Sequence, residues 1–106
     1  MFSKKQRIDR EKIGKIMKNP DFLFNNTLLT IKKTKNNLGY NRYSTIVPKK
    51  TEKSAVKRHF IKRKIVNWVK ESPLCIGFDL IFYIKNKDII KNKKEFDSLV
   101  KKCIID

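Results

Sequence analysis

The sequence is short of the residues on which many active sites, metal sites and membrane segments depend. Its 106 residues include three glycines, three prolines, two cysteines and one histidine. With so few glycines, the chain contains no P-loop or dinucleotide-binding glycine motif. The longest apolar run, Leu80 to Ile84, is far shorter than the roughly 18 to 20 residues of a membrane-spanning helix. We therefore expect no transmembrane segment.

The cysteines and the N-terminal residues favour an intracellular protein. Cys75 and Cys103 lie far apart, and neither has a Cys or His at a ligand-like spacing. This pattern predicts neither a disulfide framework nor a zinc site. The first ten residues are basic but no apolar stretch follows them, which is unlike a signal peptide. We expect two reduced thiols and a cytoplasmic location.

Acidic residues are also scarce, with 10 Asp and Glu against 27 Lys and Arg, so the formal net charge is +17. Such an excess repels itself in a folded domain, and a polyanionic partner is the simplest reason for a sequence to keep it. Nucleic acid is the leading candidate, because each phosphate that Lys or Arg neutralises releases counterions. A generally solvated basic surface and an anionic membrane surface are the alternatives.

The hydrophobic content, 40% of the residues, is sufficient for a folded chain despite the charge. The length favours one domain over residues 1–106, with a basic tail at 1–8 and a Lys- and Asn-rich loop at 85–94. Periodicity predicts the order α-β-β-β-α-β-α. One mixed four-stranded sheet with helices packed on it, an α+β fold, accounts for this order. Helices are expected over 9–18, 54–71 and around 96–103, strands over 22–24, 27–31, 43–47 and 78–84, and a loop over 32–41.

The densest basic region surrounds the start of the second predicted helix. Residues 48–64 contain eight Lys and Arg residues and a single acid, Glu52. On a helix, Arg58 and Lys62 stack one turn apart and project beside the apolar stripe rather than opposite it. We therefore expect the first turns to overhang the core and present Arg58, His59 and Lys62 to a partner. The amide groups of the helix N-terminus also attract anions.

This region resembles the signature of the bacterial ribonuclease P protein subunit. In that family a Ser-Lys-Lys segment leads into Ala-Val-x-Arg-Asn-Arg-x-Lys-Arg, the RNR motif. Here Lys49 and Lys50 precede the run Ala55-Val56-Lys57-Arg58-His59-Phe60-Ile61-Lys62-Arg63. Pro48 replaces the Ser, His59 the Asn and Phe60 the second Arg. Length, charge, element order and an Asp at the start of the last strand, Asp79, extend the resemblance over most of the chain.

The resemblance implies a function in tRNA maturation. Members of that family assist a catalytic RNA that removes the 5′ leader from precursor tRNA, and the RNA with its Mg²⁺ ions performs the hydrolysis. The implied partners are ribonuclease P RNA and precursor tRNA, with no membrane, no required protein partner and no catalytic or metal-binding residue in the protein. The implied fold has a left-handed βαβ crossover and is similar to the second domain of a small-subunit ribosomal protein.

The resemblance also implies two sets of binding residues. Phe60 either stacks on an unpaired base or packs against the protein, and both interpretations stay open. Ile13 and Met17 stand where family members often have aromatic residues, so they either contact the leader weakly or only pack. The RNA-binding set is Lys49, Lys50, Lys53, Lys57, Arg58, His59, Phe60, Lys62 and Arg63. The set for the substrate-leader cleft, between the first helix and the sheet, is Ile13, Met17, Ile31, Ile46 and Lys50.

Other functions are less well supported by the residues. The only histidine, His59, has basic neighbours and no carboxylate to orient it, which disfavours a protein-only nuclease. Asp79 is expected to form hydrogen bonds within the fold, and Glu95 with Asp97 to start the last helix. The main alternative is a structural RNA-binding protein of the ribosomal type with no role in catalysis. It predicts salt-sensitive RNA binding without stimulation of leader removal.

Overall fold

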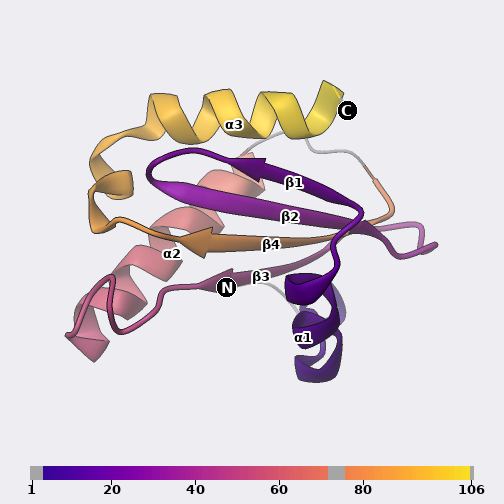
Figure 1. The fold of residues 1–106 in the computed structure, drawn as a ribbon, viewed down its shortest axis with the longest axis horizontal. Helices are drawn as coiled ribbons and strands as arrows, with labels where there is room; N and C mark the ends of the chain where they lie inside the picture. Colours follow the sequence, from indigo (N-terminus) through magenta and orange to yellow (C-terminus); the bar gives the residue numbers. More distant parts are fainter. Residues whose placement is uncertain (1–3, 72–75, 106) are drawn as a thin grey trace.

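The computed structural model describes residues 4–71 and 76–105 and consists of a single sheet with helices on both faces (Figure 1). The predicted order of elements is confirmed. Cys75 lies outside the described residues. The elements are the 3₁₀-helix η1 (Lys4–Gln6), α1 (Arg10–Lys18), β1 (Phe22–Asn25), β2 (Leu29–Lys35), β3 (Arg42–Ile46), α2 (Ala55–Glu71), β4 (Phe78–Ile84), the 3₁₀-helix η2 (Lys87–Lys91) and α3 (Lys93–Ile105).

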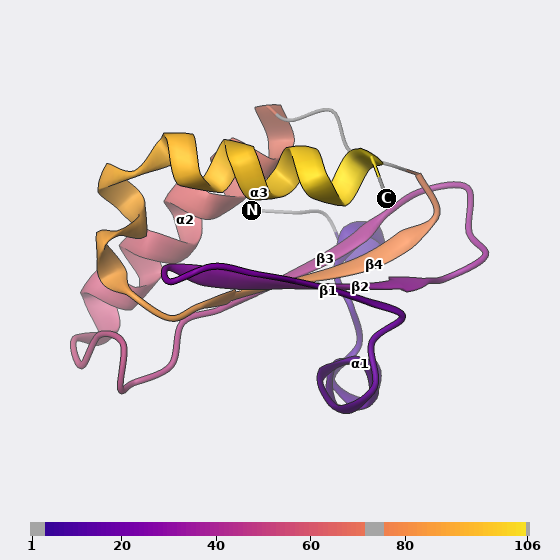
Figure 2. The same cartoon turned by 45° about the horizontal axis from the view of Figure 1, so that its top comes forward.

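The sheet has four strands in the order β1-β2-β4-β3. β2 pairs antiparallel with β1 and β4, whereas β3 and β4 are parallel, so the sheet is mixed as predicted. Parallel neighbours need a crossover connection, and α2 supplies it. α2 and α3 cover one face of the sheet and α1 lies on the other (Figure 2). The left-handed sense of the crossover stays a prediction.

The main core lies between the sheet and the pair α2 and α3. Alternate residues of β4, among them Leu80 and Phe82, point into it and are fully buried. Each large apolar side chain buried in this way stabilises the fold by roughly 1.5 to 3 kcal/mol. The helices contribute Ile61, Ile65, Val66, Trp68, Val69, Phe96, Leu99, Val100 and Cys103.

A smaller core lies under α1 and includes part of the expected N-terminal tail. Ile8, Ile16 and Ile81 are buried there. The backbone of Arg7 forms an isolated parallel β-bridge with Tyr43 of β3, and the Ile8 N–H donates to the Tyr43 carbonyl at 3.3 Å. Residues 4–8 are therefore part of the folded domain, which corrects the prediction of a tail. The physical reason is that burial of Ile8 holds this basic segment against the edge of the sheet.

β2 is longer than predicted, because the expected loop at 32–41 begins with four residues of strand. Consecutive strand residues point to opposite faces. The Lys32 Nζ donates to the Met17 carbonyl at 2.7 Å in the last turn of α1. The Lys33 Nζ donates to the Cys103 carbonyl at 2.8 Å near the end of α3. Each ammonium satisfies a C-terminal carbonyl and opposes the negative end of the helix dipole.

Lys33 gives the first testable prediction. Its side chain is 1% exposed, and its Nζ lies 4.6 and 4.5 Å from the ring centroids of Phe22 and Phe78. Lys33→Glu places a carboxylate against a carbonyl and the negative ring faces, and it is expected to lower the free energy of unfolding by more than about 4 kcal/mol. Lys33→Met keeps the volume of the side chain and is expected to lower the free energy of unfolding by at most about 3 kcal/mol.

Urea unfolding of these variants tests the role of Lys33. Lys35→Glu is the matched control, because it makes the same charge change at an exposed position of the same strand. It is expected to change the free energy of unfolding by less than about 0.5 kcal/mol. A Lys33→Glu protein as stable as the Lys35→Glu protein would contradict the prediction.

The segment 85–94 is also more ordered than expected, since it contains η2 and the start of α3. The Asn86 Oδ1 accepts a hydrogen bond from the Asp88 N–H at 2.9 Å and so caps η2. Ile89 is fully buried in the main core, and its burial explains why the segment folds back as a short helix. α3 begins at Lys93, before the start predicted at Glu95. η2 contacts α2 as a result.

Candidate nucleic-acid interface

The start of α2 extends beyond the core, at the lower left of Figure 1. In this helix no residue before Ile61 is buried. Because the buried apolar positions begin only there, the first six residues have no core to pack on, as the sequence pattern predicts. The Lys57 N–H donates to the Ser54 Oγ at 3.3 Å, and this caps the helix start. The overhanging turns therefore present their side chains to solvent.

Most of the predicted RNA-binding residues are exposed on this overhang and on the loop before it. Lys62 is half-buried, with its stem beside the core and close to the β3 edge. Thr51 fixes the loop, since its Oγ1 donates to the Ile84 carbonyl at 2.9 Å. The structure thus places these basic residues on the first turns of α2 and in the loop before it. The exposed members are Lys49, Lys50, Lys53, Lys57, His59, Phe60 and Arg63.

Arg58 differs from the other residues of this set, because it is half-buried and bonds to the backbone of its own chain. Its Nη1 donates to the carbonyls of Glu52 at 3.0 Å and Lys53 at 2.8 Å. Arg58 therefore holds the loop against the helix that follows it. Spacing along the chain gives no sign of this positioning role, because it depends on the shape of the loop.

Glu52, the one acid in the basic region, also has a structural role. Its Oε1 accepts a hydrogen bond from the Ser54 N–H at 3.2 Å, and its Oε2 lies 3.7 Å from the Lys87 Nζ of η2. The hydrogen bond from Ser54, followed by the charges of Lys87 and Lys57, lowers the pKa of Glu52. The carboxylate therefore stays ionised at neutral pH and links the loop to η2.

A hollow of about 240 Å³ connects this surface to the N-terminal segment. Arg7 and Lys62 line it, together with Ser44 and Thr45 of the edge strand β3. Among the described residues, the Thr45 Oγ1 is a buried side-chain oxygen with no hydrogen-bond partner. The hollow adds Arg7 to the basic surface, although the RNA-binding set predicted from the sequence does not include it.

Three of the five residues predicted for the leader cleft come together on the other face of the sheet. Ile13 and Met17 of α1 and Ile46 of β3 all pack against the small core under α1. Their side chains are partly buried, so each has both packed and accessible surface. Lys50 is exposed in the loop that follows the strand of Ile46. Whether these residues contact a leader stays a prediction.

The prediction for Ile31 is wrong. Its side chain is fully buried in the main core, on the face of the sheet that α2 and α3 cover. Because side chains alternate along a strand, Ile31 shares its face with Leu29 and Lys33. The β2 residues on the α1 face are instead Thr30, Lys32 and Thr34. A residue at the position of Ile31 has no access to the leader cleft.

Tyr83, which is outside the set predicted for the leader cleft, also lies on the α1 face of the sheet. Tyr83 of β4 pairs with Thr30 of β2 and Ile46 of β3, and it lies two residues from Ile81, which packs under α1. It is partly exposed. The alternation of β4 side chains between the two faces of the sheet is the sequence signal for this position, because it places the Tyr83 ring on the α1 face. Leu23, 59% exposed on β1, lies on the same face.

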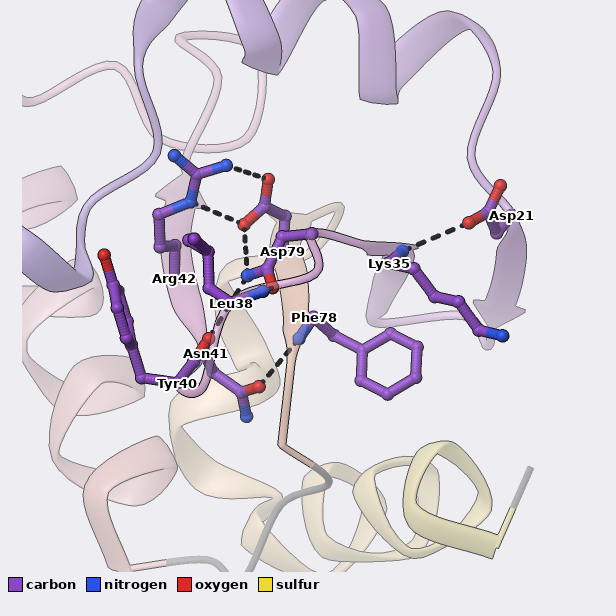
Figure 3. A network of polar contacts seen from close by, with 9 residues as sticks. Asp21, Lys35, Leu38, Tyr40, Asn41, Arg42, Phe78 and Asp79 are labelled. Carbon is purple, nitrogen blue, oxygen red and sulfur yellow. Dashed lines mark hydrogen bonds and ion pairs between the residues drawn. The ribbon is translucent and has the colours of Figure 1, made fainter.

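A buried ion pair fixes the end of the sheet beside the cleft (Figure 3). The Arg42 Nε and Nη2 donate to the Asp79 Oδ1 at 2.7 Å and Oδ2 at 2.6 Å. The Asn36 Nδ2 also donates to Oδ1, at 3.0 Å. The hydrogen bond to Asp79 raises the pKa of Arg42. The expected hydrogen-bonding role of Asp79 is confirmed, and it joins the loop 36–41 to β3 and β4.

The described residues offer few groups for catalysis. Within residues 4–71 and 76–105, no three His, Cys, Asp or Glu side chains come together as a candidate metal site. His59 is exposed near the start of α2. In the same part of the chain, no helix combines the length and apolar character needed to cross a membrane.

Comparisons with known proteins agree with this architecture. The protein-family model described as ribonuclease P matches residues 2–104. The ribonuclease P protein of Thermotoga maritima has a similar structure, with a TM-score of 0.74, 18% identity, and coverage of 92% of this chain and 94% of that one. For the Staphylococcus aureus ribonuclease P protein the TM-score is 0.73, with 23% identity and coverage of 93% of this chain and 97% of that one. A search of curated proteins finds no match. Because the family model spans nearly the whole chain and the fold agrees, the chain belongs to the ribonuclease P protein family.

Proposed function

We propose that the protein binds ribonuclease P RNA through the start of α2 and the 5′ leader of precursor tRNA on the α1 face, and so promotes removal of the leader. Family membership makes it a subunit of a tRNA-processing endoribonuclease. The observation that supports RNA binding most directly is the overhang of α2. Its basic turns have no core to pack on, so contact with a polyanion is the role that their charges fit.

The proposed mechanism is electrostatic. The catalytic RNA and its precursor substrate are both polyanions and repel each other. A protein of charge +17 between them screens this repulsion, while its cleft holds the leader that distinguishes precursor from product. The expected effects are tighter binding of precursor tRNA and a lower requirement for Mg²⁺.

The proposal assigns the chemistry to the RNA subunit. In keeping with the family, we propose that the RNA subunit holds the catalytic Mg²⁺ ions and that no protein residue has a catalytic role. The proposal includes a cytoplasmic location, the compartment in which the cysteines are expected to stay reduced.

The leader cleft is tested through Tyr83. Tyr83→Leu keeps an apolar side chain but removes the ring, and stacking on a base contributes about 1 to 3 kcal/mol. We expect the variant holoenzyme to bind precursor tRNA with a long single-stranded leader at least about fivefold more weakly. Binding of mature tRNA is expected to be unchanged. The measurement is equilibrium binding of both RNAs to wild-type and variant holoenzymes.

Two outcomes would count against this use of the cleft. Equal loss of affinity for precursor and mature tRNA would show that Tyr83 acts through the fold or through the RNA subunit. No loss for either RNA would show that the leader does not contact the ring.

A further inference from the structure

We propose that the groove between the start of α2 and η2 binds an unpaired nucleobase of ribonuclease P RNA, with Phe60 as the surface on which the base stacks. This inference rests on the proposed function. It adds a binding site, because η2 lies outside both sets of residues predicted from the sequence.

The groove has a volume of about 350 Å³, within the range of about 300 to 1,000 Å³ that is usual for small-molecule sites. Phe60 and Ile61 form its apolar side on α2, and Ile90 forms its apolar side on η2. The Phe60 side chain is 52% exposed, whereas Ile61 is 2% exposed. The groove therefore has a closed apolar floor and an open aromatic wall.

The charges around the groove suit a nucleotide. Lys57, Lys87 and Lys91 stand at its rim, where each is able to contact a phosphate. The carboxylates of Glu52 and Asp88 also line it, and carboxylates accept hydrogen bonds from base amino groups. An apolar floor with acceptors and cations fits a base with its flanking phosphates better than it fits a phosphate alone.

Phe60 is also one of the positions at which this chain departs from the family motif, in which an Arg stands there. Replacing Arg by Phe gives up a charge, so the ring needs a different role. Packing within the protein does not supply one, because half of the side chain is exposed. The Lys64 Nζ lies over the ring, 6.0 Å from its centroid, but Lys64 is not part of the groove lining. The exposed ring favours stacking over the packing alternative.

The test is the affinity of Phe60 variants for ribonuclease P RNA, measured over a series of salt concentrations. Phe60→Leu is expected to weaken binding about fivefold to a hundredfold at every salt concentration. The slope of log affinity against log salt is expected to stay unchanged, because no charge is lost. Lys91→Gln is expected to flatten this slope by about 1. Phe60→Tyr keeps an aromatic ring and is expected to retain wild-type affinity.

Val56→Ala is the matched control, because Val56 is an apolar residue of the same helix, 80% exposed and absent from the groove lining. It is expected to leave affinity unchanged. Thermal unfolding of each variant shows whether a loss of affinity reflects loss of fold. Because Phe60 is half exposed, Phe60→Leu is expected to unfold near the wild-type temperature.

The results separate this inference from the proposed function. If wild-type protein binds the RNA and Phe60→Leu binds equally well, the groove inference is wrong and the proposed function stands. If Phe60→Leu instead changes the oligomeric state at unchanged RNA affinity, the groove is a protein contact and the inference is also wrong. If wild-type protein fails to bind ribonuclease P RNA, both fail.

Discussion

Replacing Lys62 and Arg63 together by alanine is expected to weaken binding to ribonuclease P RNA by on the order of tenfold to a hundredfold. Both residues lie where α2 leaves the core, Arg63 exposed and Lys62 beside the β3 edge. Loss of two phosphate contacts is also expected to flatten the dependence of log affinity on log salt by about 2. The measurement is equilibrium binding at several salt concentrations.

Lys101→Ala with Lys102→Ala is the matched control for this double variant. These two exposed residues of α3 carry the same charge, but they lie near the opposite end of the molecule from the start of α2 (Figure 1). We expect their loss to reduce affinity by less than about threefold. Equal losses in the two double variants would show that only net charge matters, which contradicts a local interface on α2. Arg58 is left intact because it holds the loop before α2.

Removing the Asp79 carboxylate is expected to lower the free energy of unfolding strongly. Asp79→Ala leaves Arg42 without its bidentate partner and removes one of the two acceptors of the Asn36 amide, which keeps the Tyr40 carbonyl. The Arg42 and Asp79 side chains are 12% and 5% exposed. Removing one partner of a buried ion pair lowers the free energy of unfolding by about 3 to 5 kcal/mol. Urea unfolding is expected to show a loss of this size in the free energy of unfolding.

The double variant Arg42→Ala with Asp79→Ala checks the cause of this loss. Removing both charges eliminates the unpaired guanidinium, so the double variant is expected to be more stable than the sum of the two single losses predicts. Strict additivity of the single losses, or a loss below about 1 kcal/mol for Asp79→Ala, would mean that the pair behaves as a surface salt bridge.

Local patterns predict most of the elements, because helices and strands with a strong period need little information from the rest of the chain. The apolar spacing of α2 and the uninterrupted apolar run of β4 are examples. The end of β2 is different, since Lys33 is buried only because α3 places the Cys103 carbonyl beside it. A contact 70 residues away in the sequence leaves no local signal, and a run of lysines then suggests a loop.

The same distinction applies to the site. The basic residues of α2 are apparent from their spacing and from the RNR-like motif. The face of Ile31 depends on strand register, which the β4 pairing decides. The groove beside Phe60 depends on η2, a segment whose composition suggests a loop but whose Ile89 is fully buried. Sites formed within one helix are thus predictable, whereas sites formed between distant segments need the fold.

The proposed function is tested most directly by cleavage of precursor tRNA by a bacterial ribonuclease P RNA at low Mg²⁺, with and without this protein. The account predicts that the wild-type protein accelerates leader removal and lowers the Mg²⁺ requirement. It also predicts that Lys62→Ala with Arg63→Ala loses this effect, whereas Lys101→Ala with Lys102→Ala retains it. Salt-sensitive RNA binding without any acceleration, in the presence of a cognate RNA, would contradict the account and indicate a structural RNA-binding protein.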